Sequence, residues 1–394
     1  MMNTQPLNLD FESSAIAGPE QLARVLSSYH TVTDEVDSSF MPKFSAWLRT
    51  MGFETRIILT GHNQHLACSI GPSSSPKLRV AFVGHYDTVP LGAGWSYAPL
   101  GGEEVSGRLY GRGVADMKSG VAAMVFAAHE LASEGVYSTI FIPGDEETTS
   151  EGMPALLESE SYVFDLCIGG EPTSKEVLGD CLKIGRRGRI VGSVTLHGKA
   201  GHAAYAEMTP NIVHRLPSVI EALGAPWNDT SGGTATTLSI TNIASDNSAS
   251  NVIPGNVTIS FDTRSSPRRC LDDVESEIKA RLAQTGVPHT LCIIRRTSPY
   301  LTDTKEADGG PNSTGRNAKL VACAVQTIKD LSGVTPQVTC DGGTSDARFI
   351  AVAGVPTIEF GVPHGNMHGP DEFVEVASIS LLRDIYVGIL RGMI

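Results

Sequence analysis

The sequence has few of the features that mark a membrane protein or a disulfide-rich secreted protein. Its 394 residues include seven cysteines, which are scattered from Cys68 to Cys340 without a CxxC pair. Such a dispersed, odd-numbered set predicts neither a disulfide framework nor a thiolate zinc site. The longest apolar runs, such as 121–128, fall far short of the ~20 residues of a membrane helix. The first 20 residues lack the basic and apolar regions of a secretory signal, so we expect a soluble, cytoplasmic protein.

Positive charge is also scarce. There are 30 Lys and Arg against 43 Asp and Glu, which gives a formal net charge of −13. Nucleic acids and anionic membranes bind dense cationic surfaces, so neither is an expected partner. The 41% hydrophobic and 19% charged content is ordinary for a globular protein and too apolar for a disordered one.

Strand-like and helix-like segments alternate over roughly the first 180 residues. This order predicts an α/β fold with a mostly parallel sheet and flanking helices, and the segments after 297 have the same character. The expected strands are 78–84, 139–143, 166–169 and 357–361, and the expected helices are 119–131, 317–332 and 378–392.

From about Gly185 the strands alternate apolar and polar residues, as half-exposed strands do. Strand, helix, two strands, helix and strand in this order predict a compact α+β domain. We therefore expect an α/β domain (1–184 and 298–394) interrupted by a smaller domain (185–297). The elements of the inserted domain are expected at 190–197, 211–223, 236–243, 256–264, 271–284 and 289–295.

Histidine and acidic residues follow the predicted strands of the α/β domain. Open α/β sheets place their sites at the carboxyl ends of strands, so these side chains are candidates for a common site. They are His85 and Asp87 after the first strand, Asp116 in a glycine-rich turn before a helix, Glu146 and Glu147 after the second strand, Glu171 after the third, and His364 and His368 in a glycine-rich loop near the C-terminus.

Each of these residues also has an ordinary structural interpretation. The HxD pair at 85–87 could belong to a capped loop, Asp116 could cap the following helix, and Glu146–Glu147 could form a solvated turn. However, carboxylates that follow three successive strands would repel one another unless a cation lay among them. Oxygen and nitrogen ligands without thiolate suit Zn²⁺, with Co²⁺ or Mn²⁺ as possible substitutes. We therefore expect a metal site here.

Five short motifs between residues 80 and 375 carry a family resemblance. In chain order they are GHYDTVP, GRGVADMKSG, GDEETTS, GGEPTS and HGPDE. They resemble the di-zinc family of aminoacylases, acetylornithine deacetylase, succinyl-diaminopimelate desuccinylase and related carboxypeptidases. The resemblance implies a zinc-peptidase-like catalytic domain (1–184 and 298–394), an inserted α+β dimerisation domain (185–297) and a homodimer.

The resemblance also implies how two Zn²⁺ ions would be held. One ion would be bound by His85 and Glu171 and the other by Glu147 and His368, with Asp116 bridging the two. A carboxylate has two oxygens and can serve both ions at once. Two ions that share a water lower the pKa of that water and polarise the scissile carbonyl.

Three further residues receive catalytic roles by the same resemblance. Asp87 would orient His85, and Glu146 would act as general base toward the attacking water. His202 of the inserted domain would reach the active site of a partner subunit and stabilise the oxyanion. His364 competes with His368 as the C-terminal ligand; His368 is preferred because it directly precedes the GPDE stretch.

Other segments look most like succinyl-diaminopimelate desuccinylase. They are KIGRRG, GHAAY, NVIPG and CDGGTSDARF. Such an enzyme hydrolyses an amide with carboxylates at both ends, and arginine side chains are suited to bind carboxylates. The substrate-binding residues implied are Arg187 and Arg264, with Asn251, Tyr205, Gly343 and Thr344 as neighbours.

Two departures leave the substrate open. Arg189 stands where that enzyme has a small hydroxyl residue, and 303–312 looks like an added loop. The best expectation is hydrolysis of N-succinyl-LL-2,6-diaminopimelate to succinate and LL-diaminopimelate. The alternatives are a deacylase of N-acetylornithine or another N-acyl amino acid, a dipeptidase or carboxypeptidase of the same family, or an inactive structural or binding member.

Overall fold

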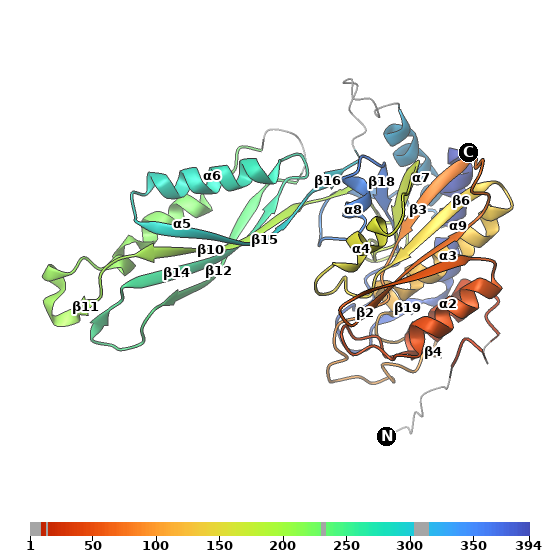
Figure 1. Cartoon of the computed structure of the whole chain (residues 1–394), viewed down its shortest axis with the longest axis horizontal. Helices are drawn as coiled ribbons and strands as arrows, with labels where there is room; N and C mark the ends of the chain where they lie inside the picture. The colour runs from red at the N-terminus through yellow and green to blue at the C-terminus, as the bar shows by residue number, and fades with distance from the viewer. Residues whose placement is uncertain (1–8, 13–14, 230–233, 303–314) are drawn as a thin grey trace. The chain divides into compact units, whose positions relative to one another are not determined.

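The computed structural model describes residues 9–12, 15–229, 234–302 and 315–394, which divide into two compact units (Figure 1). The first unit contains the described residues up to Ile184 together with Thr302–Thr339 and Ser345–Ile394. The second unit contains Gly185–Leu301 and the short segment Cys340–Thr344. The predicted loop at 303–312 lies outside the described residues. In the part of the chain that is described, no helix has both the length and the apolar character needed to cross a membrane.

A mixed sheet of eight strands forms the centre of the first unit. The strands are β1 (Glu54–Thr60), β2 (Asn63–Ile70), β3 (Leu78–Val83), β6 (Val136–Ile142), β7 (Leu166–Gly169), β8 (Cys181–Lys183), β17 (Gln337–Thr339) and β18 (Thr357–Glu359). They are arranged in the order β1-β2-β6-β3-β7-β18-β8-β17. The central pairs β6-β3, β3-β7 and β7-β18 are parallel, whereas β1 and β2 add antiparallel strands at one edge. The predicted α/β fold with a mostly parallel sheet is therefore confirmed.

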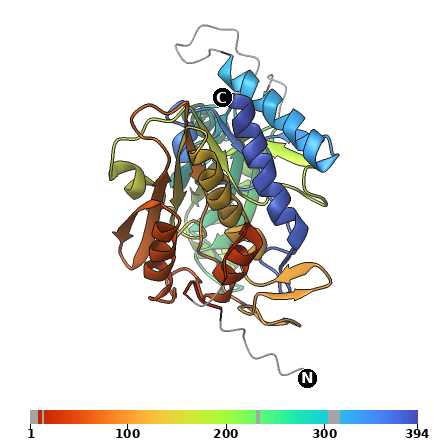
Figure 2. The same cartoon turned by 90° about the vertical axis from the view of Figure 1, so that its right-hand side faces the viewer.

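Helices cover both faces of this sheet because its central strands are apolar on both sides. On β3, Val80 and Phe82 belong to the larger apolar core, and Ala81 and Val83 belong to a second, smaller core. Successive strand residues point to opposite faces, so the two cores lie on opposite sides of the sheet. The larger core is formed with α1 (Pro19–Ser28), α2 (Phe40–Thr50), α3 (Ser119–Ala132), α7 (Arg316–Ser332) and α9 (Val376–Met393), and the smaller one with α4 (Gly152–Glu158) and α8 (Arg348–Ala351). In Figure 2, α3 packs beside α9, and α9 packs beside α7.

A small three-stranded sheet joins two distant motifs of the first unit. It consists of β4 (Glu103–Val105), β5 (Arg108–Tyr110) and β19 (Phe373–Glu375), and Phe373 pairs with Tyr110 in an antiparallel register. The GRGVAD motif begins directly after β5, and the HGPDE motif ends directly before β19. The pairing therefore places the two motifs side by side.

The second unit is an antiparallel sheet packed against two helices (Figure 1). Its sheet has the order β12-β14-β10-β15, with β10 (Gly188–His197), β12 (Thr237–Ser245), β14 (Asn256–Ser265) and β15 (His289–Thr297). Every second residue of β14 is buried, and Val257, Ile259 and Phe261 share a core with residues of α5 (Leu216–Gly224) and α6 (Leu271–Gln284). Two short ribbons complete the unit: β9 (Gly185–Arg186) with β16 (Tyr300–Leu301), and β11 (Gly201–His202) with β13 (Val252–Ile253).

The helix expected at 211–223 is divided in two. A 3₁₀ turn at Ile212–Arg215 precedes α5, and Pro217 occupies the first turn of α5. Proline lacks a backbone N–H and is compatible with the first turn of a helix but not with its interior. The amphipathic pattern therefore continues across a break that the proline imposes.

Candidate metal centre

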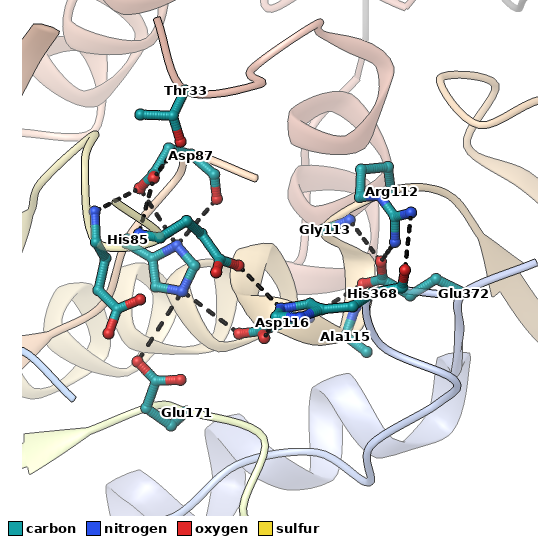
Figure 3. Close-up of polar contacts among 12 residues, drawn as sticks. Thr33, His85, Asp87, Arg112, Gly113, Ala115, Asp116, Glu171, His368 and Glu372 are labelled. Carbon is teal, nitrogen blue, oxygen red and sulfur yellow. Dashed lines mark hydrogen bonds and ion pairs between the residues drawn. The ribbon is translucent and has the colours of Figure 1, made fainter. Parts of the chain in front are cut away.

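The residues that follow the parallel strands meet at one edge of the main sheet (Figure 3). β6, β3 and β7 are neighbours, and their carboxyl ends lead into Glu146–Glu147, His85–Asp87 and Glu171. His85, Asp116 and Glu147 each have a nitrogen or oxygen atom within 4.8 Å of those of the other two. The structure thus brings the candidate ligands together where open α/β sheets place their sites.

Asp116 lies between the two histidines and turns one oxygen toward each. Its Oδ1 is 3.4 Å from His85 Nε2, and its Oδ2 is 3.2 Å from His368 Nε2 (Figure 3). His85 Nε2 also lies 4.0 Å from Glu171 Oε1, and His368 Nε2 lies 3.1 Å from Glu147 Oε1. The side chains therefore form two groups, and Asp116 contacts a histidine of both.

The carboxylates favour positive charge at both imidazoles. Hydrogen bonds to Asp116 and Glu147 raise the pKa of His368 to about 10. Burial alone would lower the pKa of His85, but the neighbouring carboxylates of Asp116 and Asp87 raise it well above its ordinary value. Burial would also raise the pKa of Asp116, yet the two histidines hold it below its ordinary value. The site therefore has a negative potential that stabilises cations.

The residues present fit two divalent cations. Asp116, Glu147, Glu171 and the two histidines offer oxygen and nitrogen donors without thiolate, a combination that suits Zn²⁺. Asp116 Oδ1 is buried and accepts no hydrogen bond from the described residues. Buried polar atoms normally have a partner, and a cation between Asp116 and His85 would supply one.

Asp87 supports His85 and the Glu146–Glu147 pair at once. It is fully buried, accepts a hydrogen bond from Thr33 Oγ1 at 2.8 Å, and accepts the backbone N–H groups of Glu146 and Glu147 at 3.2 Å each. His85 Nδ1 donates to the backbone carbonyl of Asp87 at 3.0 Å and lies 3.5 Å from its Oδ1. These contacts leave His85 Nε2 free to bind a metal. The sequence predicted the contact with His85 but neither the Glu146–Glu147 backbone contacts nor Thr33.

A second buried network shapes the loop that carries Glu146 and Glu147. Asp145 accepts hydrogen bonds from Thr149 Oγ1 at 2.6 Å and from the backbone N–H of Glu151 at 2.8 Å. His65 Nδ1 accepts the backbone N–H of Gly144 at 3.1 Å, so the proton of the neutral ring is on Nε2, 2.6 Å from Thr60 Oγ1. Burial lowers the pKa of His65, which favours this neutral form. The sequence alone identified neither residue, although Asp145 lies inside the GDEETTS motif.

Glu146 lies beside the two groups without joining either. Among the described residues, no ion pair connects its carboxylate to His85 or His368. Its side chain is half-buried, and burial together with the nearby charge of Glu171 raises its pKa well above the ordinary value. The Glu146 carboxylate lies close to the candidate ligands but, among the described residues, forms an ion pair with neither histidine, so it is available to exchange a proton.

The C-terminal histidine loop is bent by left-handed residues. Asn366 and His368 have φ values of 60° and 64°, and a side chain at Gly365 would collide with the carbonyl oxygen of Phe373. Non-glycine residues are uncommon in this region and cluster at functional sites. Within the described part of the chain, no ion pair joins His364 to the carboxylates, so the geometry favours His368 as the C-terminal ligand.

Three candidate residues of the second unit surround the β11-β13 ribbon. His202 pairs with Val252 in the ribbon, and the backbone carbonyl of Asn251 accepts a hydrogen bond from Ala203. The rings of His202 and Tyr205 are 5.8 Å apart, and both side chains are exposed. His202 Nδ1 accepts the backbone N–H of Ala204 at 3.1 Å, so in the neutral ring Nε2 carries the proton and can donate.

The remaining candidates of the second unit lie near the other end of β10. Arg187 Nη2 donates to the backbone carbonyl of Arg264 at 2.9 Å, so the two predicted anion-binding residues are in contact. Gly343 and Thr344 belong to the segment 340–344, and Arg186 donates to the carbonyl of Gly343 at 3.2 Å. All six predicted substrate-binding residues therefore fall in the second unit.

Arg189 is held by an acidic partner in the same sheet. It lies opposite Arg264 in the pairing of β10 with β14, where two like charges would repel. Asp262 accepts hydrogen bonds from Arg189 Nε at 2.9 Å and Nη2 at 2.7 Å through one oxygen, and from Arg264 Nε at 3.1 Å through the other. Asp262 therefore compensates the additional positive charge that Arg189 introduces.

Comparison with known proteins gives one consistent result. Residues 81–392 match the pattern described as peptidase family M20/M25/M40. A succinyl-diaminopimelate desuccinylase of Magnetococcus marinus is 34% identical over 389 residues, which covers 95% of this chain and 98% of the relative. An M20 family metallo-carboxypeptidase of Sulfolobus solfataricus has a similar fold, with a TM-score of 0.73 at 15% identity over 94% of this chain and 98% of that one. A dinuclear metal-binding peptidase of the M20 family from Bacillus subtilis is similar with a TM-score of 0.67 at 12% identity over 95% and 98% of the two chains.

Proposed function

The chain belongs to peptidase family M20/M25/M40, and from this premise we propose that it is a di-metal amidohydrolase that deacylates an N-acyl amino acid. The observation that carries the proposal is the position of Asp116, whose two oxygens face two different histidines. The proposed ligands are His85 and Glu171 for one ion and Glu147 and His368 for the other. Zinc is the proposed metal, with Co²⁺ or Mn²⁺ as substitutes. The relative from Bacillus subtilis, described as dinuclear, supports a pair of ions.

In the proposed reaction the cations activate the water and the amide carbonyl, and Glu146 transfers the proton. Two bound cations would lower the pKa of a shared water and polarise the amide carbonyl. Glu146 accepts the proton of the attacking water through its carboxylate and returns it to the nitrogen of the leaving amine. Asp87 fixes the backbone of Glu146, so the base is held in place before the substrate binds.

The proposed substrate is N-succinyl-LL-2,6-diaminopimelate, which would give succinate and LL-diaminopimelate. The desuccinylase of Magnetococcus marinus supports this choice, because it matches almost the whole chain. Arg187 and Arg264 support it as well, since the Arg187 guanidinium contacts the backbone of Arg264 and two neighbouring arginine residues suit a substrate with carboxylates at its ends. Asn251, Tyr205, Gly343 and Thr344 are proposed as further substrate contacts.

A substrate screen tests this choice. We expect the zinc-loaded enzyme to have a higher kcat/KM for N-succinyl-LL-2,6-diaminopimelate than for N-acetylornithine, other N-acyl amino acids or dipeptides. Replacing Arg264 by Met should reduce this preference, because it removes one of the two guanidinium groups. A preference for N-acetylornithine or a dipeptide would reassign the substrate within the family, and no turnover of any amide would support an inactive binding protein.

We further propose a homodimer formed through the second unit, in which His202 serves the active site of a second copy. Arg187 directly precedes β10, and His202 follows its far end, where the ribbon of β11 with β13 continues the same strand pairing. The ten residues of β10 span about 30 Å. A small substrate bound at Arg187 is therefore out of reach of the His202 on the same chain. The exposed Nε2–H of a His202 from the second copy would donate to the oxyanion.

Mixing two inactive variants tests this arrangement. Glu146→Gln and His202→Ala should each be nearly inactive alone, and subunit exchange between them should restore activity. The reason is that a mixed dimer has one site with Glu146 on its own chain and an intact His202 from the other chain. Continued inactivity after exchange, or a fully active monomer in sedimentation, would contradict the dimer proposal without affecting the proposed reaction.

A further inference from the structure

We propose that the buried pair Arg112 and Glu372 is a positioning device that holds the loops of Asp116 and His368 in their metal-binding geometry. The inference rests on the proposed di-metal function and concerns two residues that contact no candidate ligand side chain directly. Both are almost completely buried, with 2% of Arg112 and none of Glu372 exposed, and they form an ion pair of 2.7 Å (Figure 3).

The carboxylate of Glu372 organises the turn that carries Asp116. Its Oε1 accepts the backbone N–H groups of Ala115 at 3.0 Å and Asp116 at 3.2 Å. Its Oε2 accepts the N–H of Gly113 at 3.1 Å and the guanidinium of Arg112. Three of the four backbone N–H groups from Gly113 to Asp116 therefore converge on one carboxylate, which fixes the direction in which the Asp116 side chain leaves the loop.

The guanidinium of Arg112 extends this support to two other loops. Its Nη1 donates to the backbone carbonyl of Gly369 at 3.1 Å, and its Nη2 lies 3.4 Å from the carbonyl of His368. Nη2 also donates to the carbonyl of Leu91 at 3.1 Å, in the segment that follows His85 and Asp87. The guanidinium lies over the ring of Trp95, with 5.1 Å to the centroid.

A metal site of this kind requires such support because its two halves come from distant parts of the chain. Asp116 must offer one oxygen to each ion, whereas His368 lies on a loop with left-handed backbone residues. Glu372 lies at the end of the loop that carries His368. Its hydrogen bonds from the backbone N–H groups of Ala115 and Asp116 therefore set the distance between this loop and Asp116. Without the pair, metal binding would have to order both loops and would be weaker by the ordering free energy.

The matched test uses two buried arginines with the same kinds of contact. Arg281, in the second unit, also pairs with a glutamate, donates to the carbonyls of Leu223, Ala225 and Pro226, and lies over a tryptophan ring. Arg112→Lys and Arg281→Lys therefore remove equivalent contacts, but only the first belongs to the metal centre. Zinc affinity of the metal-free proteins, measured by competition with a chelator, should fall about 10- to 100-fold in Arg112→Lys. It should be unchanged in Arg281→Lys, even if both variants melt at a lower temperature.

Glu372→Gln is the complementary variant. The amide nitrogen of Gln cannot accept a hydrogen bond, so two of the donors that converge on Glu372 lose their acceptor, and the zinc affinity should fall as in Arg112→Lys. If this variant does not fold, hydrogen exchange of the metal-free wild-type protein provides the measurement. The amides of Gly113, Ala115 and Asp116 should then exchange slowly before any metal is added.

The outcomes separate this inference from the proposed function. If the wild type binds zinc and Arg112→Lys binds it with the same affinity, the positioning role is wrong and the di-metal function stands. Fast exchange of the three amides in the metal-free wild type would also overturn the positioning role. If the wild type binds no zinc at all, the di-metal function fails and this inference fails with it.

Discussion

Replacing Glu146 by Gln is expected to reduce kcat by about 10²- to 10⁴-fold, the usual contribution of a general base. Gln has the shape of Glu but cannot accept the proton of the attacking water. Glu146 is the carboxylate of the site that forms no ion pair with either histidine among the described residues, so its loss should leave the metal content intact. The backbone N–H of residue 146 would still donate to Asp87, which keeps the loop in place.

The neighbouring residue supplies the control. Glu147→Gln changes the same atoms one position along the chain, but Glu147 Oε1 lies 3.1 Å from His368 Nε2 and belongs to the proposed ligand set. We expect this variant to lose zinc affinity, whereas Glu146→Gln should lose turnover at full zinc occupancy. Full activity of Glu146→Gln would exclude it as the base, and equal loss of zinc in both variants would make Glu146 a ligand.

Removal of the metals is the second change with a large expected effect. A chelator such as EDTA should abolish measurable amide hydrolysis, because water without a metal is a poor nucleophile at neutral pH. Adding Zn²⁺ or Co²⁺ should restore turnover. The measurement is the hydrolysis rate of the dialysed protein before and after addition of each ion.

Calcium provides the control for metal removal. Ca²⁺ prefers oxygen ligands, whereas His85 and His368 contribute imidazole nitrogens to the site, so Ca²⁺ should not restore activity. Recovery with Ca²⁺ would contradict the proposed histidine ligands. Activity that persists in the dialysed protein would contradict the metal-dependent mechanism as a whole.

Three of the candidate ligands could be predicted because each follows a recognisable strand, whereas Asp116 and His368 were predicted from glycine-rich motifs. Parallel neighbours end at the same edge of a sheet, so the order β6-β3-β7 brings Glu147, His85 and Glu171 together even though they are far apart in the chain. The pattern of short apolar strands and intervening helices was sufficient to predict β3, β6, β7 and β18, but not β1, β2, β8 and β17. It was also sufficient for the antiparallel sheet of the second unit, where buried and half-exposed residues alternate along β10 and β14.

The supporting contacts could not be predicted in the same way. Arg112 and Glu372 are separated by 260 residues, and Asp87 and the backbone of Glu147 by 60. Nothing in the local pattern around Glu372 distinguishes a buried acceptor of four donors from an exposed acidic residue. The pairing of β5 with β19 that brings the two motifs together involves only three residues on each strand. Such short pairings leave no periodic signal in the sequence.

The positions of Arg187 and His202 at opposite ends of β10 became evident only in the structure. The resemblance had already assigned His202 to the active site of a partner subunit. The length of β10 supports that proposal, because a substrate bound at Arg187 would be out of reach of the His202 on the same chain.

The most direct test of the account is a zinc titration of the metal-free enzyme with N-succinyl-LL-2,6-diaminopimelate as substrate, in which bound zinc and the rate of succinate release are measured on the same samples. We expect that no succinate is released before zinc is added and that the rate reaches its plateau at two bound zinc ions per chain. Full release of succinate by the metal-free protein would contradict this expectation. Absence of succinate release at two bound zinc ions per chain would also contradict it, whether or not another amide is hydrolysed.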